Sequence, residues 1–374
     1  MRFITLMARN LFRRRTRTLL TAVGLALAIA TVLDLVGIAW NFERAFLTLF
    51  VGKGIDLVVV RAGTSNQLSS ALDQGLADRI RSLDGVKEVA ASLLDTVGFE
   101  QAQIASAIVN GWEPDSLLFR GSHLLEGRSF HPGETNVTLL GRVLALNLGK
   151  KAGDPLDVAG EPFRVIGVFE SDSAFESGAL IMPLATLQKL MGREGQVTGI
   201  VVEAKSSEKA SIEALRKSIE SEIPGVAATP ARDYVERDVQ IRLVKVMAWA
   251  TTVLSLVLGA VGMLNTMIMA VFERTREIGV LRALGWRRTR VLRLILGESI
   301  ILGLVGAALG MVLAILGLRV LMLAPTAQGF VDPRLPAPVL AFGLVMGLAL
   351  SVLGGLYPAL RAASLDPSEA LRHE

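Results

Sequence analysis

Apolar residues gather in four long runs along this chain of 374 residues, and polar positions separate the runs. A helix needs about 20 consecutive apolar residues to cross a hydrocarbon core of about 30 Å. The pattern therefore predicts four transmembrane helices, at residues 18–40, 244–272, 291–323 and 339–361. The remaining segments are then residues 1–17, 41–243, 273–290, 324–338 and 362–374.

The segment 41–243 has a different pattern, in which short β-branched runs alternate with stretches of helical period. Strands are predicted at Ile55–Val60, Phe163–Phe169 and Gly199–Ala204, and helices at residues 76–83 and 211–223. A strand–helix–strand order occurs near each end of the segment, so we expect one subdomain interrupted by an insert at about residues 95–197. The predicted fold class is an α+β membrane protein, with a large α+β domain between the first and second of four transmembrane helices.

Arginine is concentrated on one side of the predicted spans. Arginines precede the first run at Arg13, Arg14, Arg15 and Arg17, and they follow the second run at Arg274, Arg276, Arg282, Arg287, Arg288 and Arg290. The positive-inside rule therefore predicts cytoplasmic termini, a cytoplasmic 273–290 loop and an extracytoplasmic 41–243 domain. The first run continues past the signal-like Ala28–Ala30 to Trp40, which favours a retained anchor over a cleaved signal peptide.

Composition narrows the function classes. Hydrophobic residues make up 51% of the chain and charged residues 20%, which is unusual for a soluble globular protein. The chain has no cysteine, so thiolate catalysis and cysteine-based metal sites are excluded. His123 and His131 have no nearby ligand cluster, so no metal site is expected. No catalytic motif is found, and nothing indicates a nucleic-acid partner, so we expect a protein that is not an enzyme.

Glycines within the predicted spans are candidate helix contacts, because small residues let two backbones approach closely. The candidates are Gly259, Gly262, Gly303, Gly306 and Gly310. Glycine is also common in membrane helices without such a role, and both interpretations stay open.

Asp34 is the one acidic residue inside the first predicted span. It lies about 24 Å along the helix from Thr18, at 1.5 Å per residue, which places it close to the outer boundary. We expect water or a partner helix to satisfy its carboxylate, in preference to a proton relay. Glu298, near the inner end of the third span, is too distant to pair with it.

The charged segment Phe272–Arg290 lies between two apolar spans, and orientation alone explains its distal arginines. The proximal part, from Glu273 to Gly285, also has acidic residues and apolar positions with helical spacing. Ile278 and Leu281 share one helical face, whereas Val280 and Leu284 occupy the adjoining side. Gly285 suits the C-terminal turn of a short helix. The pattern predicts an amphipathic helix that docks a partner at the inner membrane face.

The sequence ERTREIGVLRALGWRRTRVLRLILGES, residues 273–299, resembles the cytoplasmic loop of MacB/FtsX/LolC-type (type VII) ABC transporter permeases. The ending YPALRAASLDPSEALRHE, residues 357–374, is similar to the tail of the same family, and the outer domain resembles its periplasmic core. The resemblance implies one helix, an outer domain of porter-like and Sabre-like halves, and then three helices. The residues that it assigns to coupling with the ATPase are Glu273, Arg274, Glu277, Ile278, Gly279, Arg282 and Gly285, and the helical face that Leu281 shares with Ile278 adds Leu281. Within this set, we expect Ile278 and Leu281 to enter a groove of the ATPase, while Glu277 and Arg282 set the register.

The family also implies partners and a location. Two copies of a cognate ATPase subunit, which bind ATP and Mg²⁺, would drive two permeases by mechanotransmission in the bacterial inner membrane. This sequence contains no G-x-x-x-x-G-K-[ST] loop, so we expect ATP hydrolysis in a separate subunit and no cofactor in this chain. Membrane lipids surround the spans. The sequence leaves open whether the second permease is a copy or a sister, and whether a periplasmic adaptor and an outer-membrane duct take part.

Two functions remain in competition. The first is export or extraction of an amphipathic substrate at the outer face of the inner membrane. The alternative is an FtsX-like transmembrane regulator of extracytoplasmic cell-wall hydrolases, with no transported substrate. The 41–243 segment favours the first, because it resembles a porter/Sabre pair more than a compact hydrolase-binding lobe. The sequence does not identify the passenger.

Overall fold

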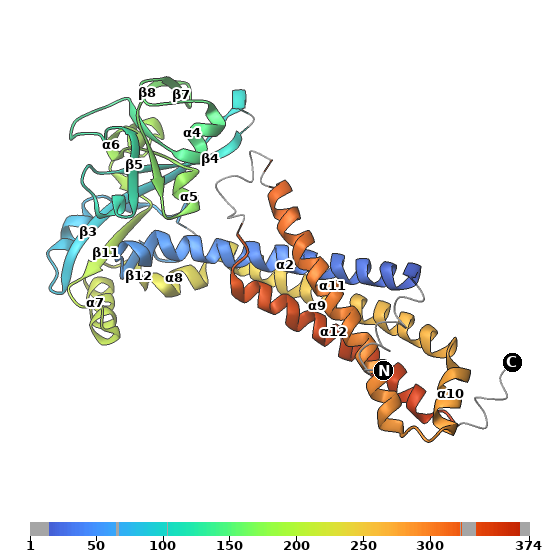
Figure 1. Cartoon of the computed structure of the whole chain (residues 1–374). Helices are drawn as coiled ribbons and strands as arrows, with labels where there is room; N and C mark the ends of the chain where they lie inside the picture. The colour runs from blue at the N-terminus through green and yellow to red at the C-terminus, as the bar shows by residue number, and fades with distance from the viewer. Residues whose placement is uncertain (1–14, 65–66, 103, 322, 324–333, 367–374) are drawn as a thin grey trace. The chain divides into compact units, whose positions relative to one another are not determined.

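The computed structural model describes residues 15–64, 67–102, 104–321, 323 and 334–366 (Figure 1). The chain divides into two compact units, a helical one and one that contains Trp40–Val244. The predicted segment before residue 15, most of the 324–338 loop and the tail after residue 366 lie outside the described residues.

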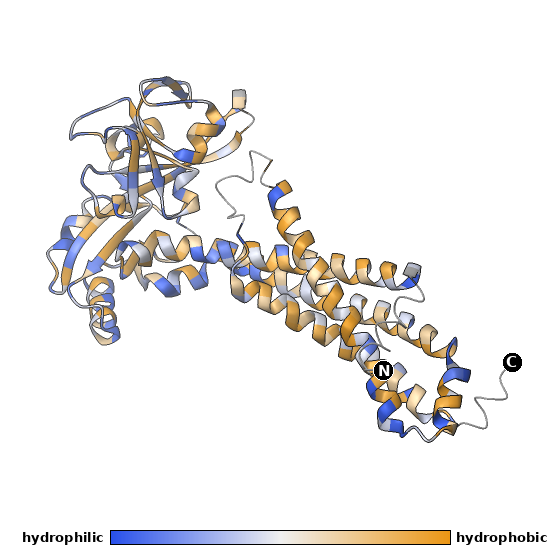
Figure 2. Ribbon diagram, in the orientation of Figure 1, coloured by the Kyte–Doolittle hydropathy of each residue, from blue (hydrophilic) through white to orange (hydrophobic). Residues whose placement is uncertain are grey.

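The helical unit is built from long apolar helices, which carry most of the hydrophobic colour in Figure 2. Four helices contain a stretch long and apolar enough to cross a membrane: α2 (Arg15–Phe50), α9 (Val239–Phe272), α11 (Arg288–Leu321) and α12 (Ala337–Ser364). A short helix, α10 (Thr275–Ala283), follows α9. Helix α2 continues past Trp40, the end that its hydropathy predicts, as far as Phe50.

Glycine allows the helices of this unit to approach closely. A Cβ on Gly303 would lie 1.8 Å from Ser351 Oγ of α12, and a Cβ on Gly306 would lie 2.8 Å from Leu25 Cβ of α2. Gly310 meets the backbone and side chains of α2, and Gly259 meets α12. The missing side chains at these positions therefore let α11 approach both α2 and α12.

Gly262 differs from the other glycines for which a helix contact is expected. No atom lies within 4 Å of the position that its Cβ would take. Among the described residues Gly262 therefore makes no close helix contact, which fits the alternative that glycine has no packing role at this position. Contacts that the sequence analysis missed lie on α12, where Gly347 approaches Ala307 and Gly354 approaches Met263.

The second unit contains a ten-stranded sheet in the order β12-β1-β11-β3-β4-β9-β6-β8-β5, with β7 paired to β8. Its strands are β1 (Leu57–Arg61), β3 (Val86–Phe99), β4 (Ile104–Trp112), β5 (Ser122–Gly127), β6 (Val137–Gly141), β7 (Pro155–Val158), β8 (Glu161–Ser171), β9 (Leu180–Pro183), β11 (Gly199–Ala204) and β12 (Val226–Pro230). Strands β2 (Leu72–Asp73) and β10 (Gln196–Val197) form a separate pair. Short helices complete the unit: α3 (Leu76–Arg81), α4 (Arg142–Leu148), α5 (Ala174–Ser177), α6 (Leu184–Leu190), α7 (Lys209–Glu222) and α8 (Ala231–Arg237).

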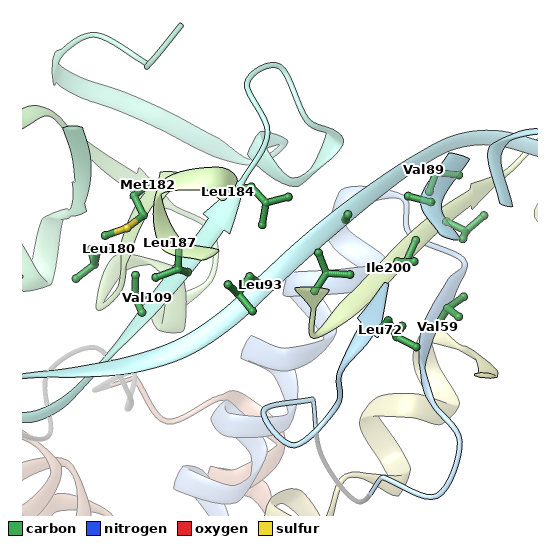
Figure 3. Close-up of a cluster of buried hydrophobic side chains, with 14 of the residues drawn as sticks. Val59, Leu72, Val89, Leu93, Val109, Leu180, Met182, Leu184, Leu187 and Ile200 are labelled. Atoms are coloured by element: carbon green, nitrogen blue, oxygen red, sulfur yellow. The ribbon is translucent and has the colours of Figure 1, made fainter. Parts of the chain in front are cut away.

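Both ends of this unit meet in one half of the sheet, where β1 pairs with β11 and with β12. Strands β4 to β9 build the other half, and the long strand β3 joins the halves by pairing with β11 and β4. A continuous apolar core follows this path, from Val59 and Ile200 through Leu93 to Val109 and Leu187 (Figure 3). The α+β fold class with four long apolar helices is thus confirmed.

Candidate functional site

Helix α10 ends in a turn that its sequence specifies. The amide of Gly285 donates to the carbonyl of Arg282, and the amide of Trp286 donates to the carbonyl of Leu281. These two hydrogen bonds form a Schellman motif, which requires a left-handed residue after the helix. Gly285 supplies it with φ +93°. The motif ends α10 after nine residues, about two and a half turns, and redirects the chain into α11.

The two sides of α10 have different surroundings. Ile278 is only 1% exposed and lies in an apolar cluster with Val271 and Val291. On the other side, Val280 is 42% exposed and Leu284 is 75% exposed. Arg276 and Glu277 are exposed as well, so the exposed face of α10 combines two apolar side chains with two charges of opposite sign.

An ion pair with little exposure fixes the start of α10 to α11. Arg274 Nη1 donates to both carboxylate oxygens of Glu298, at 3.1 and 3.0 Å. The Glu298 side chain is 4% exposed and the Arg274 side chain 14%. Arg274 Nε also donates to Glu277 at 3.3 Å. Because a charge cut off from water is costly without its partner, this pair fixes the position of α10.

A second ion pair joins the ends of α2 and α9. The two guanidinium nitrogens of Arg17 donate to the two carboxylate oxygens of Glu273, both at 2.8 Å. This fork geometry is more directional than a single contact. One turn further along α2, the hydroxyls of Thr21 and Thr266 lie 2.9 Å apart. Helices α2, α9 and α11 are therefore all connected to the base of α10.

The structure changes the roles expected within this segment. Glu273 and Arg274 form ion pairs with other residues of this chain. Ile278 is buried against neighbouring helices, so in this conformation its side chain is not exposed for the contact with a partner's groove that the sequence predicts. Leu281 and Arg282 are half-buried, and Gly279 is buried. The sequence places Val280 and Leu284 beside the predicted docking face, yet these two are the large apolar side chains that are exposed here.

The ion-pair roles of Glu298 and Arg17 were not predicted from the sequence. An acidic residue inside an apolar span that follows an arginine-rich loop is a signal that could have identified Glu298 as an internal ion-pair partner. Asp34, the other acidic residue in a span, lies beside Gly317 of α11, and one of its oxygens is buried without a hydrogen-bond partner among the described residues. Within the described ranges no group of three or more His, Asp or Glu side chains could hold a metal ion.

Comparison with protein families assigns both parts of the chain. Residues 18–222 match the MacB-like periplasmic core domain, which is more than half of the chain, and residues 249–367 match the FtsX-like permease C-terminal domain. The chain belongs to the MacB/FtsX-type family of ABC transporter permeases. The second match contains α10 with both ion-pair partners Arg274 and Glu298, so the candidate site lies in the permease part of the family.

Relatives of this MacB/FtsX-type permease fall into two length classes. An ABC transporter permease of Methanocaldococcus jannaschii is 26% identical over 99% of this chain and 98% of its own length. The ABC transporter permease YknZ of Bacillus subtilis is 23% identical, over 98% of this chain and 97% of its own length. The macrolide export ATP-binding/permease protein MacB of Shewanella sp. is 27% identical over 96% of this chain, which spans only 58% of that protein.

A solved structure of the periplasmic region of MacB from Actinobacillus actinomycetemcomitans is similar to half of the chain. The two chains are 16% identical with a TM-score of 0.38, and the matched region covers 50% of this chain and 94% of the solved MacB chain. The two family matches and the four long apolar helices, independently of that solved structure, make the chain a multi-pass membrane protein of ABC permease type, with a MacB-like domain between its first and second long helices.

Proposed function

We propose that this permease couples ATP hydrolysis by a separate ATPase subunit to export or extraction of an amphipathic substrate at the outer face of the inner membrane. The ATPase docks on the exposed face of α10, and its movement passes through the helices to the outer domain by mechanotransmission. The observation that supports this most is the division of α10 into an anchored side and an exposed apolar side.

The anchors explain how a force on α10 could be passed on. Ile278 in the apolar cluster and the Arg274–Glu298 pair connect α10 to α11. The Arg17–Glu273 pair connects its base to α2. A partner that pushes or pulls the exposed face of α10 therefore moves several helices together. Helix α2 is continuous from Arg15 to Phe50, so a shift at its inner end extends along its whole length.

The proposed assembly has two ATPase copies, which carry ATP and Mg²⁺, and two permeases with cytoplasmic termini. The relatives that align over their whole length are called ABC transporter permeases, which supports transport over the role of an FtsX-like regulator. The chain has no cysteine that could bind a metal. The proposed docking surface consists of side chains that contact the ATPase directly, so the proposal involves no cofactor in this chain.

Substitution of the exposed face tests this proposal. Leu284→Asp places a charge where a partner would bury an apolar side chain worth about 1.5–3 kcal/mol, so we expect at least a tenfold loss of co-purified ATPase. Leu146→Asp is the matched control, because Leu146 is 70% exposed on α4 of the other unit. Undiminished ATPase binding by a Val280→Asp/Leu284→Asp protein that still inserts into the membrane would overturn the proposal.

A further inference from the structure

The outer unit contains a cavity of about 400 Å³ that the coupling account does not use. Its walls come from the last turns of α2, from β3 and β4, and from α5. Phe42 and Phe46 of α2 contact Phe175 of α5, with ring centroids 5.0 and 4.7 Å apart, and Trp112 of β4 also lines the space. This size and this aromatic lining are typical of small-molecule sites.

The floor of the cavity is one face of the β3–β4 ladder. Leu94 pairs with Asn110 and Thr96 pairs with Ile108, and all four line the cavity. Successive side chains on a strand point to opposite faces. Their neighbours Leu93 and Val109 accordingly belong to the apolar core in Figure 3. The same two strands thus serve a core on one face and a cavity on the other.

Two residues that line this cavity are largely buried, and their side-chain polar atoms, which stay accessible to solvent, make no hydrogen bond among the described residues. Ser92 is 5% exposed and Asn110 is 8% exposed. Neither side chain makes a hydrogen bond to any residue in the part of the chain that the structure describes. A few accessible polar groups in a largely apolar pocket are what fixes the orientation of a bound small molecule. A ligand in the cavity would find an amide that both donates and accepts, and a hydroxyl, beside an aromatic wall.

The charges that line the cavity are already neutralised. Glu176 accepts a hydrogen bond from Lys53 Nζ at 2.5 Å and another from Ser171 Oγ at 2.6 Å. Both members of the Glu176–Lys53 pair are buried, and Lys53 also lies over the ring of Trp112, 4.8 Å from its centroid. With no free charge to offer, the cavity disfavours a ligand whose ionised group would have to enter it.

We propose that this cavity binds an uncharged amphiphile. An alkyl chain lies against Phe42, Phe46 and Phe175, and an ester, amide or hydroxyl group bonds to Ser92 and Asn110. This inference rests on the proposed function and names the chemistry of its passenger. The alkyl chain of the ligand can belong to a membrane lipid or to an acylated peptide, since both offer an alkyl chain next to an uncharged carbonyl group.

Trp112 reports on occupancy, because it lines the cavity and bromine quenches tryptophan fluorescence on contact. The full chain is placed in lipid nanodiscs with Trp40→Phe, Trp249→Phe and Trp286→Phe, which leaves Trp112 as the only tryptophan. We expect saturable quenching by a dibrominated monoacylglycerol, and weaker quenching by the anionic dibrominated fatty acid. A dibrominated N-acyl peptide amide forms the second arm; tighter binding in either arm identifies that source.

Variants separate specific binding from partition into the bilayer. Asn110→Leu removes one hydrogen-bonding group and should weaken binding about tenfold. Ser106→Phe fills the mouth of the cavity and should abolish saturable quenching, whereas Ser221→Phe, at an exposed serine of α7, should leave it unchanged. Quenching that does not saturate, or that is equal in the Ser106→Phe and Ser221→Phe proteins, overturns the proposal.

The binding measurement needs no ATPase, so the two proposals fail separately. If Leu284→Asp abolishes co-purification of the ATPase but Trp112 shows no saturable quenching, the proposed function stands and the proposed ligand is wrong. A chain that binds the monoacylglycerol but keeps its ATPase after Leu284→Asp has the site without the proposed coupling.

Discussion

The ion pair between Arg274 and Glu298 gives the sharpest prediction about the helical unit. Glu298→Gln keeps the size of the side chain and removes its charge. The Arg274 side chain is only 14% exposed, so it then stays largely buried. It also loses the carboxylate that accepts its two hydrogen bonds of 3.0 and 3.1 Å. The position of α10 should become less well fixed.

The magnitude follows from burial. Removing one partner of a buried pair costs about 3–5 kcal/mol. Arg274 retains a contact of 3.3 Å with Glu277, so we expect a value near the lower end, about 3 kcal/mol, or roughly a hundredfold in the unfolding equilibrium. Glu277 is 54% exposed, so Glu277→Gln removes the other contact of the same arginine for about 0–1 kcal/mol.

The assay compares thermal unfolding of the two variants in the same detergent, together with the ATPase activity of the reconstituted complex. Glu298→Gln should lower the midpoint clearly and uncouple ATPase activity from transport, whereas Glu277→Gln should change the midpoint little. The exchange Arg274→Glu/Glu298→Arg should recover part of the loss. Equal midpoints for Glu298→Gln and Glu277→Gln would show that the Arg274–Glu298 pair does not hold α10 in place.

Three further predictions concern other parts of the chain. Gly303→Ala places a Cβ 1.8 Å from Ser351 Oγ and should destabilise the helices by about 1–3 kcal/mol in thermal unfolding, whereas Gly262→Ala meets open space and should cost nothing; equal effects would contradict the packing account. Hydrogen bonds from Arg128 and from the His131 amide lower the pKa of Glu134 from 4.5 to about 2, so the contribution of Glu134 to stability is present above pH 4.5 and is lost as the pH falls toward 2. An NMR titration of the Glu134 carboxyl should give a midpoint near 2 that rises in Arg128→Gln, and a midpoint of 4.5 in the unaltered chain would contradict this. Glu176→Gln leaves the buried ammonium of Lys53 with the carbonyl of Leu118 but without its carboxylate, and should destabilise the unit that contains the sheet by about 3 kcal/mol, with partial recovery in Lys53→Met/Glu176→Leu; an unchanged midpoint for the single variant would argue against a structural pair.

Hydropathy predicted the four long helices because a bilayer demands about 20 apolar residues at a time. It did not predict that α2 continues to Phe50. The residues after Trp40 include Glu43 and Arg44, which lower the hydropathy without ending the helix. Local periodicity likewise located strands such as Gly199–Ala204, whose bounds agree with β11.

Pairings between distant residues could not be predicted. Helix α10 has apolar residues at 278, 280, 281 and 284, which cover more than one face of a short helix, so the pattern did not tell which face is inward. Glu298 pairs with an arginine 24 positions earlier, and this contact depends on how two helices pack. The cavity needs Phe42 and Phe175 on one wall and Asn110 on the floor, which only the folded unit brings together.

Cross-linking can show whether the exposed face of α10 contacts the ATPase, because a chain without cysteine allows one reactive cysteine to be placed at a chosen position. A bifunctional reagent on Leu284→Cys should link the permease to its ATPase, and the link should depend on assembly of the complex. Ile278→Cys, at a position 1% exposed, and Leu146→Cys, on α4 of the unit that contains the sheet, should give no such product. A link to the ATPase from Ile278→Cys but not from Leu284→Cys would contradict the proposal that the exposed face of α10 is the contact.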